Sequence, residues 1–330
     1  MKINDVEKLL GSLKKSKVLV VGDIGLDNYI VGDVKKISPE APVPVVEVKE
    51  HYYRLGLSAN VANNVKALGA KCDVIGVIGD DSNAEIIKKE LRDIKIDTDG
   101  LIIDKNRPTT HKTRVLASRL HHVVRIDRED KTALPTPIKN KIIKKCDDMI
   151  SAYDVIILED YAKGFFKNGV ASEIIDICNK AKKPVFIDPS RYTDPNFYKG
   201  ATLLKPNFDE IKLISGVEIE DEKTLQKACA EVLKRLDLEY LVVTRGKEGM
   251  TVFSKKNKPH TIPTFALEVY DVSGAGDTVI SSLALACSAG LNIYDSAFFA
   301  NTTAAIVVGK VGTAIATPDE IIKFLKEHRS

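Results

Sequence analysis

The chain has 330 residues, of which 44% are hydrophobic and 29% charged, and 49 basic against 46 acidic side chains give a net charge of +3. These values exclude disordered and membrane-spanning classes, and the scattered basic residues exclude a nucleic-acid-binding surface. Five isolated cysteines without metal-ligand spacing and an N-terminus without a long apolar run indicate a cytoplasmic protein with reduced thiols.

The first predicted strand covers residues 17–22, a β-branched run that ends at Gly22 and Asp23. This pattern is typical of a buried parallel strand whose carboxyl end opens into a site. Short strands are predicted at 29–32 and 43–49, and the prolines between them prevent a helix. An amphipathic helix closed by Gly69 follows Gly56, and a second buried strand covers 72–79.

The middle of the chain contains a helix over 81–93, with Asp81 and Ser82 as cap candidates, and two strands at 109–117 and 122–127. We expect these two strands to join the pair before residue 50 in a small sheet over one end of the core. The whole chain is predicted as one domain, 1–330, with these lid strands inserted at about 28–50 and 108–128.

Strand–helix alternation resumes at residue 135. The predicted helices are 135–151, 169–181, 207–215 and 222–236, and the predicted strands are 154–158, 184–188, 202–204, 240–244 and 250–253. Repeated units of this kind predict an α/β fold, a doubly wound and mostly parallel sheet in three layers, with ligands at the carboxyl ends of its strands. Asp23, Asp160, Asp188, Lys205 and Thr244 fall at or just beyond such ends.

The segment 271–278, DVSGAGDT, precedes an apolar run over 279–289 that predicts a buried helix. Three small residues allow the backbone N–H groups to face outward at a helix N-terminus, where unpaired donors and the macrodipole favour an anion. Asp277 lies in the first turn. A carboxylate there also acts as a plain capping or dipole partner, and local pattern alone does not separate the two roles.

Three further segments have both a functional and a purely structural interpretation. Residues 160–164 place an acid and a base at the rim of the site, or form an ordinary surface loop. Asn207 and Glu210 are spaced like a capping pair, and the local sequence pattern favours this structural role over a functional one. The turn 244–249 resembles a hairpin, although its hydroxyl and Arg245 also suit a phosphate. The histidines lack metal-ligand spacing and are interpreted as structural.

Taken together, these motifs resemble the phosphofructokinase B, or ribokinase, family of sugar kinases over nearly the whole chain. Residues 271–278 resemble its C-terminal signature, 56–62 its N-terminal glycine-rich signature, 205–210 its Asn-x-x-Glu motif and 244–249 its nucleotide-phosphate turn. The resemblance implies a ribokinase-like fold with a small β-sheet lid. Leu57 departs from the pattern, because the family usually has there the second glycine of a hinge beside the sugar.

Within the family the chain is most similar to the kinases of D-glycero-D-manno-heptose 7-phosphate, through the segments 37–46, 160–164, 268–280 and 299–313. Many of those carry a nucleotidyl-transferring domain with an HxGH-type motif, which is not found here, so we expect the kinase-only form. The implied reaction transfers the ATP γ-phosphoryl group to the anomeric C1 hydroxyl, giving heptose 1,7-bisphosphate for nucleotide-heptose and lipopolysaccharide synthesis.

The resemblance also implies roles for individual residues. Asp277 would be the general base, and the N–H groups of Gly274, Ala275 and Gly276 would stabilise the transferring phosphoryl group. ATP would be bound with Mg²⁺, which oxygens of ATP and water would hold with Glu210 in the surrounding shell. The implied ATP-binding residues are Asn207, Glu210, Thr244, Arg245, Gly246 and Asn301.

Sugar recognition would fall to Asp27, Asn60 and Asp160. The cations available for the 7-phosphate are Lys112, Arg114, Arg125 and Lys163. A monovalent cation such as K⁺ is implied near Asp271, Ser273 and Gly312. We expect a homodimer formed through the exposed edges of the lid, and neither nucleic acid nor membrane as a partner.

Two alternatives remain open from the sequence. One is a kinase of the same fold that acts on ribose, a fructose phosphate or a nucleoside. The other is a regulator that binds sugar or nucleotide without catalysis, although the intact Asp277 and the anion-binding loop, residues 271–278, favour an enzyme.

Overall fold

The computed structural model describes residues 3–117, 121–265, 270–310 and 312–328. Residues 268, 269 and 311, which belong to the heptose-kinase-like segments noted above, lie outside the described residues. The strands are β1 (Lys17–Gly22), β2 (Ile24–Ile37), β3 (Pro44–Leu57), β4 (Lys71–Ile78), β5 (Leu101–Ile103), β6 (Thr110–Ala117), β7 (His121–Arg128), β8 (Val155–Glu159), β9 (Val185–Asp188), β10 (Leu203–Leu204), β11 (Tyr240–Thr244), β12 (Met250–Ser254) and β13 (His260–Ile262).

The helices flank these strands in chain order. They are α1 (Ile3–Leu13), α2 (Ser58–Ala67), α3 (Ser82–Asp93), α4 (Thr136–Met149), α5 (Val170–Lys180), α6 (Phe208–Ser215), α7 (Glu222–Arg235), α8 (Ala275–Ser288), α9 (Ile293–Val308) and α10 (Pro318–His328). None of the helices in the described ranges is long and apolar enough to cross a membrane.

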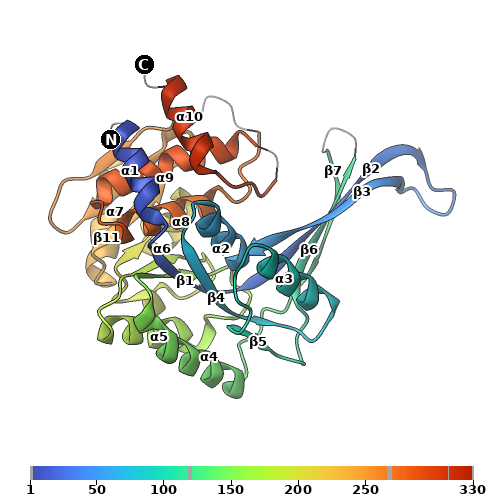
Figure 1. Ribbon diagram of the computed structural model, residues 1–330, viewed down its shortest axis with the longest axis horizontal. Coiled ribbons are helices and arrows are strands. Elements are labelled where there is room, and N and C mark those ends of the chain that lie inside the picture. The colour runs from blue at the N-terminus through green and yellow to red at the C-terminus, as the bar shows by residue number, and fades with distance from the viewer. Residues whose placement is uncertain (1–2, 118–120, 266–269, 311, 329–330) are drawn as a thin grey trace.

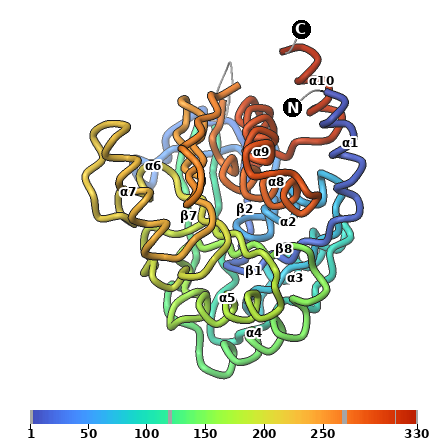
Figure 2. The backbone as a smooth tube through the Cα atoms, turned by 90° about the vertical axis from the view of Figure 1, so that its left-hand side faces the viewer, coloured from blue at the N-terminus to red at the C-terminus, as the bar shows by residue number. Residues whose placement is uncertain are grey.

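The large sheet has the order β13-β12-β11-β10-β9-β8-β1-β4-β5, and helices cover both of its faces (Figures 1 and 2). Its pairings are parallel except that β12 is antiparallel to β11 and β13 to β12. Strand β1 shows why two cores form, because Val18 and Val20 pack with α1, α2 and α8 while Leu19 and Val21 pack with α4 and α5. This arrangement confirms the predicted fold class.

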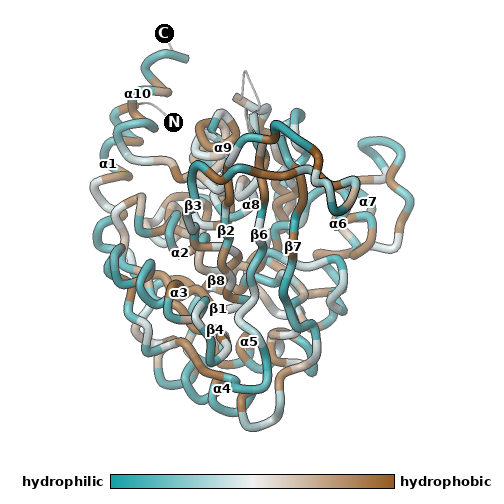
Figure 3. The backbone as a smooth tube through the Cα atoms, turned by 90° about the vertical axis from the view of Figure 1, so that its right-hand side faces the viewer, coloured by the Kyte–Doolittle hydropathy of each residue, from teal (hydrophilic) through white to brown (hydrophobic). Residues whose placement is uncertain are grey.

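The small sheet, which we call the lid, has the order β3-β2-β6-β7 and extends away from the core (Figure 1). The four strands join as expected, but β2 and β3 each have 14 residues, far longer than the predicted 29–32 and 43–49. Both faces of their outer halves are wet, so the alternation of apolar and polar residues that marks a strand is lost there. Exposed apolar side chains remain on the lid at Val34, Val48, Val124 and Ile126. Figure 3 shows hydrophobic stretches among hydrophilic ones along the lid strands.

Helix ends follow local sequence rules. The Asp81 side chain accepts a hydrogen bond from the Ala84 N–H and caps α3, as predicted. The elements α1, β5, β13, α9 and α10 were not predicted from the sequence. Two of these are three-residue strands, too short to show a period, and α9 is apolar on nearly all sides, so its helical periodicity is weak.

Candidate active site

A cleft of about 1150 Å³ lies at the carboxyl ends of the central strands, between β8–β11 and the start of α8. It is lined by residues that are far apart in the sequence, among them Glu159, Tyr161, Asp188, Lys205, Glu210, Thr244, Gly276, Asp277 and Asn301. Ligands bind at this edge of a parallel sheet because loops from several strands converge there. Of the predicted site residues, Asp160, Asn207, Arg245, Gly246 and Ala275 also line it.

Asp277 lies in the first turn of α8 and is only 6% exposed. Gly274, at φ 78°, takes the left-handed conformation that begins the helix. Asn60 Nδ2 donates to Oδ2 of Asp277 at 2.6 Å, and the Tyr161 hydroxyl donates to Oδ1 at 2.6 Å. Burial raises the pKa of Asp277 to about 6, against these two hydrogen bonds, which lower it. A carboxylate with this pKa is largely ionised at neutral pH.

The anion-binding loop differs from expectation at one residue. The Ala275 N–H donates to the Val272 carbonyl at 3.2 Å, whereas the described residues provide no partner for the N–H groups of Gly274 and Gly276. A Cβ at Gly276 would lie 3.5 Å from both Asp188 Oδ2 and Lys205 Nζ. The first turn of α8 therefore offers donors beside a buried cation.

Lys205 is buried and forms an ion pair with Asp188 at 2.8 Å, between β9 and β10. Glu159 is 1% exposed, and its Oε2 has no hydrogen-bond partner within the described residues. Burial and the nearby Asp188 and Asp277 raise the pKa of Glu159 well above its usual value. The cleft floor thus holds the acidic side chains of Glu159, Asp188 and Asp277 around Lys205, but in the part of the chain that the structure describes no group of three or more such side chains is placed to hold a metal ion by itself. A Mg²⁺ ion in the cleft would therefore take most of its ligands from a bound nucleotide and water.

Two segments with both a structural and a functional interpretation, 207–210 and 244–249, lie on the side of the cleft where the nucleotide is expected. Asn207 and Glu210 form a reciprocal capping box at α6, so the structural interpretation holds. Residues 244–249 join antiparallel β11 and β12, which confirms the hairpin. Arg245 is already paired with Glu222, at 3.0 Å, and with Glu248, so it is less available to nucleotide phosphates than the sequence indicates. Asn301 Nδ2 donates to the Pro263 carbonyl at 2.7 Å.

The lid brings a second group of predicted residues close to Tyr161 from β2 and β6, although none of them is among the residues that line the cleft. Arg114 donates to Asp27 Oδ1 at 2.6 Å and lies over the Tyr29 ring. Lys112 is half-buried, and its ammonium lies 5.9 Å from the centroid of the Tyr161 ring. Burial is the main cause that lowers the pKa of Lys112, followed in the same direction by Lys163 and Arg114. Lys112 forms no salt bridge in the described part of the chain, although Asp27 and Asp127 on the paired strands favour its charged form.

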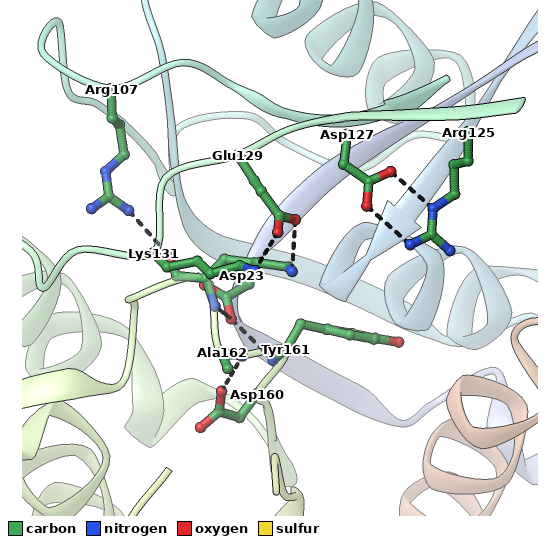
Figure 4. Close-up of polar contacts among 10 residues, drawn as sticks. Asp23, Arg107, Arg125, Asp127, Glu129, Lys131, Asp160, Tyr161 and Ala162 are labelled. Carbon is green, nitrogen blue, oxygen red and sulfur yellow. Dashed lines mark hydrogen bonds and ion pairs between the residues drawn. The ribbon is translucent and has the colours of Figure 1, made fainter. Parts of the chain in front are cut away.

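Three predicted sugar or phosphate ligands are engaged elsewhere. Lys163 forms an ion pair with Glu129 at 2.6 Å, and Arg125, 58% exposed, pairs with Asp127 (Figure 4). Asp160 accepts hydrogen bonds from the Tyr198 hydroxyl and from the Ala162 N–H, so it shapes its own loop. These partners lie on other segments or turn back on the same loop, and no short sequence pattern reports them.

The predicted monovalent-cation residues lie next to the anion-binding loop. Asp271 accepts from the Ser273 N–H at 2.8 Å and from the Gly312 N–H at 2.9 Å. These bonds lower the pKa of Asp271 and connect the loop to the segment after α9. The carboxylate is therefore used to hold the loop, and the backbone carbonyls nearby remain the candidate ligands.

Sequence reasoning gave no role to four residues that the fold brings to the site: Asp23, Tyr161, Asp188 and Lys205. The position of Asp23, Asp188 and Lys205 at strand ends was a signal, since ligands collect there. Tyr161 lies in the segment 160–164, which was predicted at the rim of the site, but nothing pointed to the tyrosine itself because its partner Asp277 lies 116 residues away.

Comparisons with known proteins agree with this geometry. Residues 15–320 match the pfkB family carbohydrate kinases. The chain is 41% identical over 317 residues to the bifunctional protein HldE of Pelobacter propionicus, covering 96% of this chain and 64% of that protein. HldE of Helicobacter hepaticus is 41% identical over 312 residues, covering 94% and 64%. The chain thus spans just under two thirds of the length of these relatives.

Solved structures share the fold. The ribokinase of Arabidopsis thaliana complexed with ribose and ATP has a TM-score of 0.75 and 21% identity, covering 94% of this chain and 99% of its own. Phosphofructokinase-2 of Escherichia coli in complex with potassium has a TM-score of 0.77 and 16% identity, covering 96% and 99%. At these identities the similarity establishes a ribokinase-like fold.

Proposed function

The chain belongs to the pfkB family of carbohydrate kinases, and from that premise we propose that it phosphorylates the C1 hydroxyl of D-glycero-D-manno-heptose 7-phosphate with ATP. The product would be heptose 1,7-bisphosphate, for use in nucleotide-heptose synthesis. The heptose-kinase-like segments and the identity to HldE proteins support this choice of substrate within the family.

One observation carries the proposal for a phosphorylated sugar. Tyr161 connects two groups of opposite charge, since its hydroxyl donates to Asp277 and its ring lies below the Lys112 ammonium. Lys112 is a half-buried cation that forms no salt bridge among the described residues and feels Asp27 and Asp127 only at longer range, and such a cation favours an anion from outside the protein. A substrate with a hydroxyl at one end and a phosphate at the other fits both groups.

Catalysis would rest on positioning and on neutralising charge. Asp277 would take the proton of the C1 hydroxyl as the oxygen attacks the γ-phosphorus and the bond to the leaving ADP breaks. The N–H groups of Gly274 and Gly276 and the nearby Lys205 would stabilise the charge on the transferring group. Glu210 would support a Mg²⁺ ion held mainly by ATP and water, which would supply positive charge at the phosphate oxygens.

Two further features, a K⁺ site and a dimer, are part of the proposal. Carbonyls around Asp271, Ser273 and Gly312 would bind K⁺ beside the anion-binding loop, as the bonds that fix this loop suggest. The exposed lid residues Val34, Val48, Val124 and Ile126, with the free edges β3 and β7, would pack against a second copy of the chain. Elution volume and light scattering of the pure protein test the dimer.

The substrate is tested with a panel of sugars and sugar phosphates, followed by mass analysis of the products. The expected result is a doubly phosphorylated heptose and a kcat/KM for heptose 7-phosphate well above that for the other sugars. A preference for an unphosphorylated sugar or a nucleoside would refute the proposed substrate. ATP binding without turnover on any sugar would favour the non-catalytic alternative.

A further inference from the structure

The Tyr161 hydroxyl and the Asn60 amide hold the two carboxylate oxygens of Asp277 from opposite sides, each at 2.6 Å. Asn60 lies on α2 and Tyr161 lies in the loop after β8, so two separate segments bind the carboxylate. We propose that Tyr161 is a positioning residue for Asp277, which fixes the carboxylate in the orientation that meets the sugar hydroxyl. The inference rests on the proposed role of Asp277 as the base.

The loop that carries Tyr161 is itself fixed by a single buried side chain. The Asp23 carboxylate accepts hydrogen bonds from the backbone N–H groups of Tyr161, Lys163 and Phe165, at 3.0, 3.1 and 3.3 Å. Figure 4 shows this carboxylate beside the loop backbone, with the Tyr161 side chain extending away from it. Because three donors converge on one group, the loop has little freedom to move the Tyr161 ring.

The ring and the hydroxyl of Tyr161 make different contacts. The ring contacts Lys112, whereas the hydroxyl donates the hydrogen bond to Asp277. A change from Tyr to Phe therefore removes only the bond to the carboxylate. A carboxylate has about four lone-pair sites, so the two donors leave room for the proton of the sugar hydroxyl while they prevent rotation.

The hydroxyl also affects the charge state of Asp277. The charged groups that face Asp277 are Glu159 on β8, Asp188 on β9 and Lys205 after β10, and Tyr161 adds a hydrogen bond that favours the ionised form. Without this bond the pKa of Asp277 rises above its value of about 6. The carboxylate then stays protonated, and inactive as a base, up to a higher pH.

The test is the pH profile of Tyr161→Phe. We expect the acidic limb of kcat/KM to move to higher pH, so that activity falls about tenfold or more at pH 6 and by less at pH 8. The matched control is Tyr153→Phe, which removes a Tyr–Asp hydrogen bond of the same 2.6 Å length, to Asp73 on the far side of the sheet. Its profile should equal that of the wild type. A Tyr161→Phe profile with unchanged limb and plateau would overturn the inference.

Two additions keep the outcome decisive. KM for ATP and circular dichroism report whether the variant is folded, and Tyr161→Met carries the same expectation if the Phe variant is not. Asp23→Asn, which cannot accept all three N–H bonds, should lower kcat more than it raises KM for ATP. If the wild type turns over no sugar phosphate, the proposed function fails. If Asp277→Asn stays active, Asp277 is not the base and the inference loses its premise. If it is inactive and the Tyr161→Phe profile is unchanged, only the positioning role fails.

Discussion

Asn60 donates a hydrogen bond to Asp277 across 217 residues of sequence, and this bond joins the N-terminal glycine-rich segment to the start of α8. Both side chains are almost fully buried, at 1% and 6% exposure. The Asn60 Oδ1 atom has no partner in the described ranges, so one face of this pair is left for a ligand.

Asp277→Asn should reduce turnover by about two or more orders of magnitude, because the amide cannot take a proton from the sugar hydroxyl. ATP affinity should be nearly unchanged, since within the described ranges the Asp277 side chain forms hydrogen bonds only with Asn60 and Tyr161. Steady-state kinetics and ATP titration check both points. Asp148→Asn, at an exposed position of α4, is the control and should behave as the wild type. Substantial residual turnover would remove Asp277 from the role of base.

Lys112→Gln should raise KM for the sugar phosphate by roughly ten- to a hundredfold, the usual size for a charge-assisted phosphate contact. KM for ATP should change little. Arg125→Gln is the comparison, because Arg125 is 58% exposed and paired with Asp127, and we expect a much smaller effect. Equal effects of Lys112→Gln on sugar phosphate and ATP would contradict a phosphate site under the lid.

Arg245→Gln should affect folding more than nucleotide binding. The guanidinium is paired with Glu222 on α7 and with Glu248 in the hairpin, so its loss separates these elements. We expect a lower melting temperature and a KM for ATP close to that of the wild type. A large rise in KM for ATP at unchanged stability would instead return Arg245 to the phosphate-binding role.

Leu57 permits a prediction about stability. Its φ of 56° lies in the region that favours glycine. Its side chain is nevertheless buried and packs closely against Gly25, where a Cβ would lie 2.8 Å from Leu57 Cδ1. Leu57→Ala keeps the backbone strain and opens a cavity, at a cost of about 2–5 kcal/mol. Leu57→Gly opens a similar cavity but releases about 1–3 kcal/mol of strain. In urea denaturation the Gly variant should therefore be the more stable of the two, and the reverse order would show that the strain is small.

The pH dependence of stability should change in Asp277→Asn. Burial raises the pKa of Asp277 from 3.8 to about 6, so the native state holds its proton where the unfolded chain has lost it. The wild type therefore loses free energy of unfolding as pH rises from about 4 to 6, and the loss is constant above that. The variant lacks this loss, so its free energy of unfolding relative to the wild type should rise by about 1–3 kcal/mol between pH 4 and pH 8. Urea denaturation at both pH values measures the difference.

The sequence predicted what local rules control. Asp81 caps α3, Asn207 and Glu210 form a capping box, and Asp277 falls in the first turn of α8, because each depends on residues within a few positions. The alternation of strands and helices gave the fold class for the same reason.

The unpredicted part of the site depends on contacts between distant segments. Arg245 meets Glu222 from a neighbouring helix, and Tyr161 meets Asp277 only after the sheet has formed. The three N–H bonds to Asp23 require the loop after β8 to lie beside the end of β1, which the strand order decides. The length of the lid strands was also missed, since a sheet with two wet faces shows no apolar alternation.

Both long lid strands enter the core at one point. A single residue, Asp23, separates β1 from β2, β3 runs into α2 without a loop, and the Ser58 N–H donates to the Asp23 carbonyl at 3.0 Å. Asn60 lies two residues beyond this junction, and Tyr161 is tied to it through the Asp23 carboxylate. The two donors of Asp277 are thus both attached to the point where the lid meets the core, so the orientation of the proposed base is coupled to the position of the lid.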